Sequence, residues 1–276
     1  MIRQYIRRSY QAVGGLVAAR RLHVGYHRKG AADAPVVVLL HGLGCTHEVW
    51  EDTIKKLPGN VSIVAVDLLG FGKSPRPWLP IHHNYVHARS VLRTLKKLGY
   101  HKDIIFVGHS LGGLVAIEAA RQRPRICQRL LLCGPPIYRN RYTPHDTASQ
   151  EAKILTSLYT ITAQVLEGDK EAAVVAAKAI TATGLAPKAV EINQQTITPY
   201  ILALRHSIIR QTSFADLASL TVPTVIIYGF FDPLLVHDTM QQLARHQHIT
   251  AKRILASHEL TRGYVRQICK RIGGEK

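Results

Sequence analysis

The sequence predicts an α/β fold, a mostly parallel sheet flanked by helices, with a helical cap inserted at one sheet edge. Short apolar runs typical of buried strands alternate along the chain with longer segments of helical periodicity. This order is typical of parallel sheets with right-handed crossovers. About 90 residues between two of these strands show helical patterns alone. The 276 residues are 46% hydrophobic and 20% charged, which fits one large domain with an insertion.

The expected elements follow one another along the chain. Leu22–His27 alternates weakly and predicts an edge strand, while the continuous apolar run Val36–Leu40 predicts a strand buried on both faces. Further strands are expected at Val61–Val66, Ile104–Val107, Arg129–Cys133, Thr224–Tyr228 and Arg253–Ala256. Core helices are expected at Tyr85–Leu98 before Gly99, at Leu111–Arg123 before Pro124, and at Val265–Arg271.

The region between Cys133 and Thr224 predicts the cap. It begins with the breaker Gly134-Pro135-Pro136, and three segments within it have helical periodicity: Gln150–Leu166, Glu171–Ala182 and Thr198–Ile209. Such an insertion lies beside the carboxyl ends of the strands, where open α/β sheets bind ligands. We therefore divide the chain into a basic N-terminal segment (1–21), a core (22–134 and 216–276) and a cap (135–215).

Two groups of cap residues are candidates for substrate contact. The first has an apolar helical spacing that fits core packing as well as a pocket: Tyr138, Tyr142, Leu155, Leu158 and Tyr159. The second is Arg205 with His206, which could meet an acidic substrate, although a solvated helix surface explains this pair better.

The formal net charge is +18, and it is concentrated at the two ends of the chain. Residues 1–30 contain seven Lys and Arg and no acid, and residues 252–276 contain seven basic and two acidic residues. A nucleic-acid binder would place such charge along a groove or recognition helix with aromatic residues for stacking, and the aromatic content is only 7%. We therefore expect no nucleic-acid partner; attraction to an anionic membrane, or solubility alone, explains the charge as well.

The N-terminal segment leaves three interpretations open. Ile2, Ile6, Val13 and Val17 could share one face of a helix, so the segment is a solvated or capping helix, a basic membrane-surface helix or a weak signal peptide. No apolar run reaches the roughly 18 to 20 residues of a spanning helix. The four cysteines are dispersed, without a CxxC pair, so we expect a reducing cytoplasm, with membrane association through the N-terminus as an option.

The strongest motif is Gly108-His109-Ser110-Leu111-Gly112-Gly113, between a predicted strand and a predicted helix. It fits G-x-S-x-G, in which a sharp strand-to-helix turn exposes the serine and brings neighbouring backbone too close for side chains at the glycine positions. The helix N-terminus beside the serine favours a developing negative charge. Ser110 is therefore the candidate nucleophile, against the alternative of an incidental serine in a glycine-rich turn.

A serine needs a base to act as a nucleophile, and the base needs an orienting acid. For this turn the chain order is serine, acid, histidine. Asp232 follows the strand Thr224–Tyr228, and His258 follows the last predicted strand. For the acid, the alternatives are that Asp232 is only a turn residue before Pro233, or that Asp238, expected inside the following helix, takes the role instead. For the base, the alternative is that His258 is an incidental member of the 15 histidines.

The expected oxyanion hole combines the backbone N–H of Leu111 with that of Leu43, in the loop that follows the Val36–Leu40 strand. His41 opens this loop, and a role in anchoring it is more plausible than a role as base or metal ligand. We expect neither a cofactor nor a metal.

The sequence resembles the α/β-hydrolase superfamily, in particular single-cap serine esterases and C–C hydrolases. The matching segments span residues 22–270: His41-Gly-Leu-Gly with Trp50, Asp67–Ser74, Gly108–Gly113, Tyr228–Pro233 and His258. The resemblance implies Ser110 as nucleophile, Asp232 as acid and His258 as base. It implies a structural loop at Asp67–Ser74, without a catalytic role.

Two departures from the family pattern matter. Ser257 stands where the family often has glycine before the histidine, and Cys133-Gly134 offers no acid after the earlier strand where some members have one. The second departure favours Asp232. The resemblance also implies that the haloalkane dehalogenases and epoxide hydrolases of this fold attack with aspartate. A serine nucleophile therefore excludes these two classes.

The favoured function is hydrolysis of carboxylic esters, with a small-molecule substrate that could be lipid-like or a monoacylglycerol. Two alternatives remain: cleavage of a C–C bond in a keto acid or a related acyl transfer, and a non-catalytic member that binds a small ligand under the cap.

Overall fold

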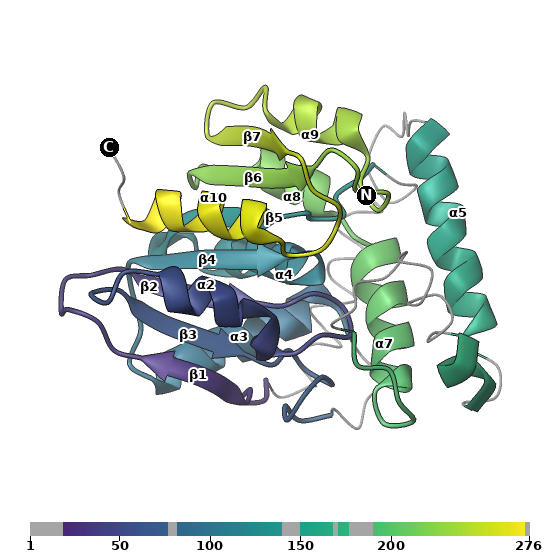
Figure 1. The fold of residues 1–276 in the computed structure, drawn as a ribbon, viewed down its shortest axis with the longest axis horizontal. Helices are drawn as coiled ribbons and strands as arrows, with labels where there is room; N and C mark the ends of the chain where they lie inside the picture. The colour runs from purple at the N-terminus through teal and green to yellow at the C-terminus, as the bar shows by residue number, and fades with distance from the viewer. Residues whose placement is uncertain (1–18, 77–81, 140–149, 168–170, 177–189, 274–276) are drawn as a thin grey trace.

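The computed structural model describes residues 19–76, 82–139, 150–167, 171–176 and 190–273 (Figure 1). A seven-stranded sheet crosses the molecule in the order β1-β3-β2-β4-β5-β6-β7, and β1 is antiparallel to β3 while every other pair is parallel. The strands are β1 (Val24–Arg28), β2 (Val36–Leu40), β3 (Ser62–Val66), β4 (Ile104–His109), β5 (Cys127–Cys133), β6 (Thr224–Gly229) and β7 (Ile249–Ile254). The predicted α/β class with a mostly parallel sheet is confirmed.

Helices cover both faces of the sheet (Figure 1). One face carries α3 (Asn84–Lys97), α4 (Leu111–Gln122), α8 (Ser213–Ala218) and α9 (His237–Leu243). The other carries η1 (His47–Trp50), α2 (Glu51–Lys56) and α10 (Arg262–Gly273), and the short η2 (Pro124–Ile126) precedes β5.

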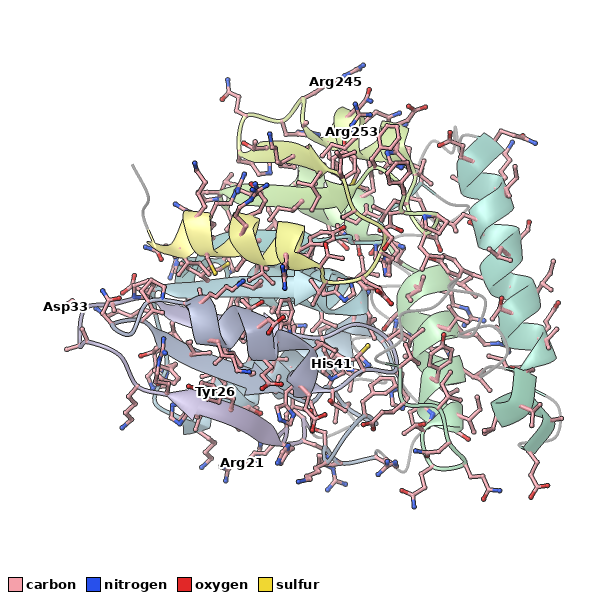
Figure 2. All side chains as sticks on the ribbon, viewed as in Figure 1. Arg21, Tyr26, Asp33, His41, Arg245 and Arg253 are labelled. Atoms are coloured by element: carbon pink, nitrogen blue, oxygen red, sulfur yellow. The ribbon has the colours of Figure 1, made fainter. Side chains whose placement is uncertain are left out.

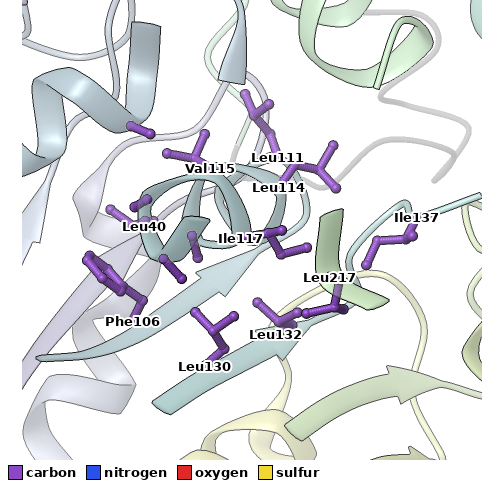
Figure 3. Close-up of a cluster of buried hydrophobic side chains, with 14 of the residues drawn as sticks. Leu40, Phe106, Leu111, Leu114, Val115, Ile117, Leu130, Leu132, Ile137 and Leu217 are labelled. Carbon is purple, nitrogen blue, oxygen red and sulfur yellow. The ribbon is translucent and has the colours of Figure 1, made fainter. Parts of the chain in front are cut away.

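The two cores follow from the alternation of side chains along the central strands. Val36, Val38 and Leu40 face α3 and α4, whereas Val37 and Leu39 face Trp50 and α10. Figure 3 shows the first core, in which Phe106, Leu130 and Leu132 of the sheet lie under Leu114 and Ile117 of α4. Burying one such side chain stabilises the fold by about 1.5–3 kcal/mol, so the central strands are rigid supports for the loops that follow them.

The predicted last strand is present, but its predicted bounds, Arg253–Ala256, are wrong. The strand is Ile249–Ile254, paired in parallel with β6. β7 is at the edge of the sheet, and Thr250, Lys252 and Arg253 are exposed. An edge strand of this kind has no continuous apolar run, so the pattern places it too late.

The helices of the segment predicted to form a cap lie beyond the carboxyl ends of the strands (Figure 1). They are α5 (Gln150–Val165), α7 (Ile197–Ala203) and η3 (Leu204–Ile209), a π-helical continuation of α7. Of the expected helix Glu171–Ala182, residues 171–176 are helical and the others lie outside the described residues. The proposed cap boundary at 215 falls within α8, whose Phe214 and Leu217 belong to the core over α4.

The N-terminal segment lies outside the described residues as far as residue 18, and so does the proposed face of Ile2, Ile6, Val13 and Val17. Among the helices that are described, none has the length and apolarity needed to cross a membrane.

Candidate active site

Ser110 occupies a strained turn between β4 and α4. Its backbone φ is 51° and its ψ is −120°, a region that non-glycine residues rarely adopt and that is typical of functional sites. Its N–H donates to the Cys133 carbonyl oxygen at 2.9 Å, and its own carbonyl oxygen accepts from the Gly113 N–H at 2.9 Å. These backbone bonds fix the turn.

The glycines around Ser110 are required by close backbone contacts. A Cβ at Gly108 would lie 2.4 Å from the Gly112 carbonyl oxygen, and a Cβ at Gly112 would lie 2.1 Å from the Leu40 carbonyl oxygen. Both contacts are with backbone that cannot move aside cheaply. The sequence motif is therefore explained by the packing of β2, β4 and α4 against one another.

Asp232 and His258 come from neighbouring strands, and the structure places them in hydrogen-bond contact. The Nδ1–H of His258 donates to Asp232 Oδ2 at 2.7 Å, while Asp232 Oδ1 accepts the Leu234 N–H at 2.9 Å. Both side chains are buried. Because Nδ1 carries the proton, the Nε2 of neutral His258 has the free lone pair that a general base needs.

The competing acid Asp238 is the second residue of α9, as expected, and it is exposed. Gly134, with φ of 53°, lies directly beside the pair instead: a Cβ there would be 3.2 Å from Asp232 Oδ2 and 3.4 Å from His258 Nδ1. Gly134, which follows β5 where the sequence offers no acid, therefore leaves room for Asp232 and His258.

His41 anchors the loop after β2. Its Nδ1–H donates to the Gly42 carbonyl oxygen at 2.7 Å, and its Nε2 accepts the Leu68 N–H at 2.8 Å. Full burial lowers the pKa of His41 to about 4, so the ring is neutral. Figure 2 shows it in the interior, in contrast to Arg21 and Arg245 at the periphery. The expected anchoring role agrees with these bonds.

The two expected oxyanion groups lie on either side of Ser110. Leu111 is the first residue of α4, so its N–H has no acceptor within the helix. Leu43 is in the loop on the other side, where a Cβ at Gly42 would lie 3.2 Å from the Ser110 Cβ. The Glu191 N–H of the cap region donates to the Gly44 carbonyl oxygen at 2.7 Å, which ties the same loop to the cap.

His109 is a site residue that the sequence pattern does not reveal, because it occupies the variable position before the serine. Its Nε2–H donates to the backbone carbonyl oxygen of His258 at 2.8 Å, and the two rings lie 5.0 Å apart. Burial above all, and then the nearby His258, lowers the pKa of His109 to about 3. The neutral ring therefore fixes the backbone of the loop that carries His258.

One cavity of about 210 Å³ connects these residues to the cap. Its lining is mainly aliphatic and aromatic: Gly42, Leu43, Cys45, His109, Ser110, Leu158, Tyr159, Thr162, Val190, Tyr200, Leu204, Ile208, Pro233, Leu234 and His258. None of these residues is Lys, Arg, Asp or Glu. The cavity therefore suits an uncharged, largely apolar group.

The cap candidates divide into two sets. Leu158 and Tyr159 line the cavity, whereas Leu155 and Tyr138 are buried in the core, and the Tyr138 hydroxyl donates to the Ile208 carbonyl oxygen at 2.9 Å. Tyr142 lies outside the described residues.

The pair Arg205 and His206 does not line the cavity. Arg205 pairs with Glu167, and the ring of His206 stacks on that of His83 at 5.3 Å. The preferred interpretation of these two residues as helix surface therefore holds for Arg205, while His206 is partly buried by packing.

Asp67 organises the loop of Asp67–Ser74 rather than the cavity. Its Oδ1 accepts from the N–H and Nδ1 of His47, and its Oδ2 accepts from the Lys73 N–H and the Nδ1 of His23, at 2.8–3.0 Å. His23, His47 and Asp67 are also the group in the described part of the chain whose donor atoms are close enough to hold a metal ion. Hydrogen bonding already accounts for both carboxylate oxygens.

The class of protein follows from comparison with known families. The sequence profile of the Alpha/beta hydrolase family matches residues 37–261, and the chain belongs to this family. Among solved structures, the esterase EaEST of Exiguobacterium antarcticum superposes with a TM-score of 0.67 at 16% identity, over 93% of this chain and 98% of that one. A haloalkane dehalogenase DbeA variant of Bradyrhizobium elkanii gives a TM-score of 0.68 at 18% identity, over 94% and 97%. At these identities the likeness shows the fold alone.

Several sequence relatives bear names from hydrolytic chemistry. RutD of Pseudomonas savastanoi pv. phaseolicola, whose name assigns it to carbamate hydrolysis, is 38% identical over 107 residues, which are 38% of this chain and 40% of that protein. A pimeloyl-[acyl-carrier protein] methyl ester esterase of Vibrio parahaemolyticus is 28% identical over 236 residues, 80% of this chain and 87% of that protein. The first match thus spans less than half the relative's length.

Proposed function

We propose that the protein is a serine hydrolase that cleaves carboxylic esters through an acyl-enzyme. The observation that carries this proposal is the convergence of Ser110, in its strained turn, with the hydrogen-bonded pair His258 and Asp232 at one uncharged cavity. Membership of the family and the ester-hydrolysing name of one relative support it. No cofactor takes part in the proposed reaction.

In the proposed acylation step, Nε2 of His258 removes the hydroxyl proton as Ser110 Oγ attacks the ester carbonyl carbon. Asp232 stabilises the resulting imidazolium through the 2.7 Å hydrogen bond. The N–H groups of Leu43 and Leu111 stabilise the oxyanion. His258 then gives the proton to the leaving alkoxide, and the alcohol departs.

Deacylation repeats the sequence with water. His258 removes a proton from water as its oxygen attacks the acyl carbon of the ester on Ser110, and the proton then returns to Ser110 Oγ as the carboxylic acid leaves. His109 holds the backbone of His258 throughout and contacts no reacting atom in this scheme.

The preferred substrate has a short, uncharged acyl group. A cavity of about 210 Å³ is smaller than the roughly 300–1,000 Å³ of sites for drug-sized ligands. A keto-acid substrate of a C–C hydrolase would bring a carboxylate into a lining without a cationic side chain of Lys or Arg, which disfavours that alternative. A lipid-like ester would have to extend beyond this cavity.

The test compares wild type with Ser110→Ala on p-nitrophenyl esters of increasing chain length. We expect wild type to prefer short chains and Ser110→Ala to lose on the order of 10³-fold or more in kcat. A phenyl carbamate and a keto acid in the same panel examine the other chemistries. Equal ester rates for the two proteins, or rates highest on the keto acid, would contradict the proposal.

A fluorophosphonate probe separates catalysis from ligand binding alone. The probe should label wild type at Ser110 and leave Ser110→Ala and His258→Gln unlabelled. A folded wild-type protein that resists the probe would instead favour the non-catalytic alternative. Contact of residues 1–21 with an anionic membrane is a separate proposal, tested by vesicle sedimentation with and without residues 1–20.

A further inference from the structure

A second concave site lies away from the cavity at Ser110, on the opposite face of the sheet from α4. It is a groove of about 510 Å³ formed with α2 and α10, and its lining is Lys56, Arg262, Gly263, Arg266, Cys269 and Lys270. Figure 1 shows α2 and α10 beside each other on that face. Four of the six lining residues are cations and none is acidic.

The four cations come to one surface because of helix geometry. Arg262, Arg266 and Lys270 are spaced by four residues and therefore form a row along α10. The other side of α10 packs into the core through Tyr264, Val265 and Ile268, all of which are buried. Lys56 at the end of α2 completes the set, and the four side chains are exposed.

No acidic residue lines the groove, whereas some cations elsewhere in the described chain have an acidic partner. Lys55 pairs with Glu51 at 2.6 Å and Arg121 with Glu118 at 2.5 Å. In the described part of the chain, by contrast, none of the four groove cations forms an ion pair. Even Asp52, four residues before Lys56 on α2, makes no ion pair with it.

An unpaired row of this kind is unfavourable for the isolated fold. Like charges four residues apart on a helix repel one another, and here the repulsion is repeated along α10 and extended by Lys56. Neither the core nor a hydrogen-bond network in the described residues uses these side-chain charges. An anion in the groove would turn the repulsion into attraction.

We propose that the α2–α10 groove binds a phosphate-bearing ligand. Guanidinium groups match phosphate oxygens with paired hydrogen bonds, and lysine supplies further point charge, so a mixture of both suits phosphate better than a single carboxylate. The volume falls in the range of small-molecule sites of roughly 300–1,000 Å³, which leaves room for more than one phosphate group. The proposal is independent of the chemistry at Ser110.

The same phosphate chemistry can be presented by a free molecule or by a lipid headgroup, and the experiment has an arm for each. Inorganic pyrophosphate is titrated by isothermal calorimetry at low and moderate salt. Sedimentation is measured with vesicles of phosphatidylcholine alone and with phosphatidylglycerol added. We expect binding in at least one anionic arm, weakening as salt rises.

The groove variant is Arg266→Glu with Lys270→Glu, and the matched control is Lys96→Glu with Lys97→Glu, two exposed lysines on α3. Each double substitution replaces two positive side chains by two negative ones and so lowers the formal net charge from +18 to +14. We expect the groove variant to weaken anion binding at least tenfold and the control to change it less than twofold. Thermal unfolding and ester hydrolysis verify that both variants remain folded.

The arms give distinct outcomes. Pyrophosphate binding that only the groove variant loses identifies a soluble phosphate ligand, and vesicle binding that only the groove variant loses identifies a lipid headgroup. Absence of binding in both arms, or equal losses in the two variants, overturns the proposal, because the second result is that of general positive charge. Ester hydrolysis unchanged in the groove variant separates this result from the fate of the proposed hydrolase.

Discussion

Several buried histidines should make the fold sensitive to mild acid. His41, His82, His83 and His109 are buried, and burial lowers their pKa values from 6.5 to about 4, 4, 3 and 3, with nearby positive groups as a smaller cause. In the unfolded chain the same residues return to an ordinary pKa near 6.5. Between these values the unfolded state binds protons that the folded state does not, so the free energy of unfolding falls as pH falls.

The size of the effect follows from the two sets of pKa values. Above about pH 7 the four histidines are neutral in both states, so their titration does not lower the free energy of unfolding there. At pH 5.5 each histidine is mostly protonated in the unfolded chain and almost unprotonated in the folded one. This difference lowers the free energy of unfolding by a little more than 1 kcal/mol per histidine and by about 5 kcal/mol for the four together. A domain is stabilised by only about 5–15 kcal/mol in total. We therefore expect marked destabilisation well above pH 4.

The assay is urea unfolding followed by circular dichroism at pH 7.5, 6.5, 5.5 and 4.5. The variant His82→Leu removes one titrating group, whose Nδ1 has no hydrogen-bond partner within the described chain, and should reduce the loss of stability at pH 5.5 by about 1 kcal/mol. His101→Gln, at an exposed position, serves as control and should leave it unchanged. A free energy of unfolding that stays level from pH 7.5 to 5.5 would refute the reasoning.

Three further substitutions test the packing and positioning derived above. Gly112→Ala places a Cβ 2.1 Å from backbone oxygen and should destabilise the protein by more than about 3 kcal/mol in urea unfolding, whereas Gly59→Ala, with open space around it, should be neutral within about 1 kcal/mol. Asp67→Asn puts an amide donor among four hydrogen-bond donors and should cost about 3–5 kcal/mol, seen as a lower Tm; an unchanged Tm would contradict the structural role of this loop. His109→Leu should lower kcat for ester hydrolysis about 10-fold or more with little change in KM, and His109→Gln, which keeps an N–H donor for the carbonyl of His258, should recover part of the loss. Equal kcat values for the Leu and Gln variants would show that this hydrogen bond does not matter.

The elements that the sequence predicts well are those whose pattern is local. Val36–Leu40 is a buried run of five apolar residues, and strand β2 has the same bounds. The turn at Ser110 is predictable because one short segment contains the strand, the glycines and the start of the helix. β7 is poorly predicted because its polarity reflects its place at the sheet edge, which depends on the order of all the strands.

The candidate site divides in the same way. The positions of Asp232 and His258 after strands are visible in the sequence, since parallel strands end at a common edge of the sheet. Their 2.7 Å hydrogen bond requires β6 and β7 to be neighbours, which no local pattern gives. The role of His109 depends on a carbonyl oxygen 149 residues away along the chain.

The sequence by itself therefore determined the class of fold, the family resemblance and the three residues of the proposed triad, because these depend on short-range periodicity and motif spacing. Only the tertiary structure decided which cap side chains face the cavity, that the cavity lining carries no acidic side chain and no Lys or Arg, and that unpaired cations of α2 and α10 share one groove. The physical reason is that each of these properties belongs to a space enclosed by segments distant in sequence. The composition alone shows the excess of positive charge. Whether these charges form a binding site depends on which of them the fold brings together without ion-pair partners.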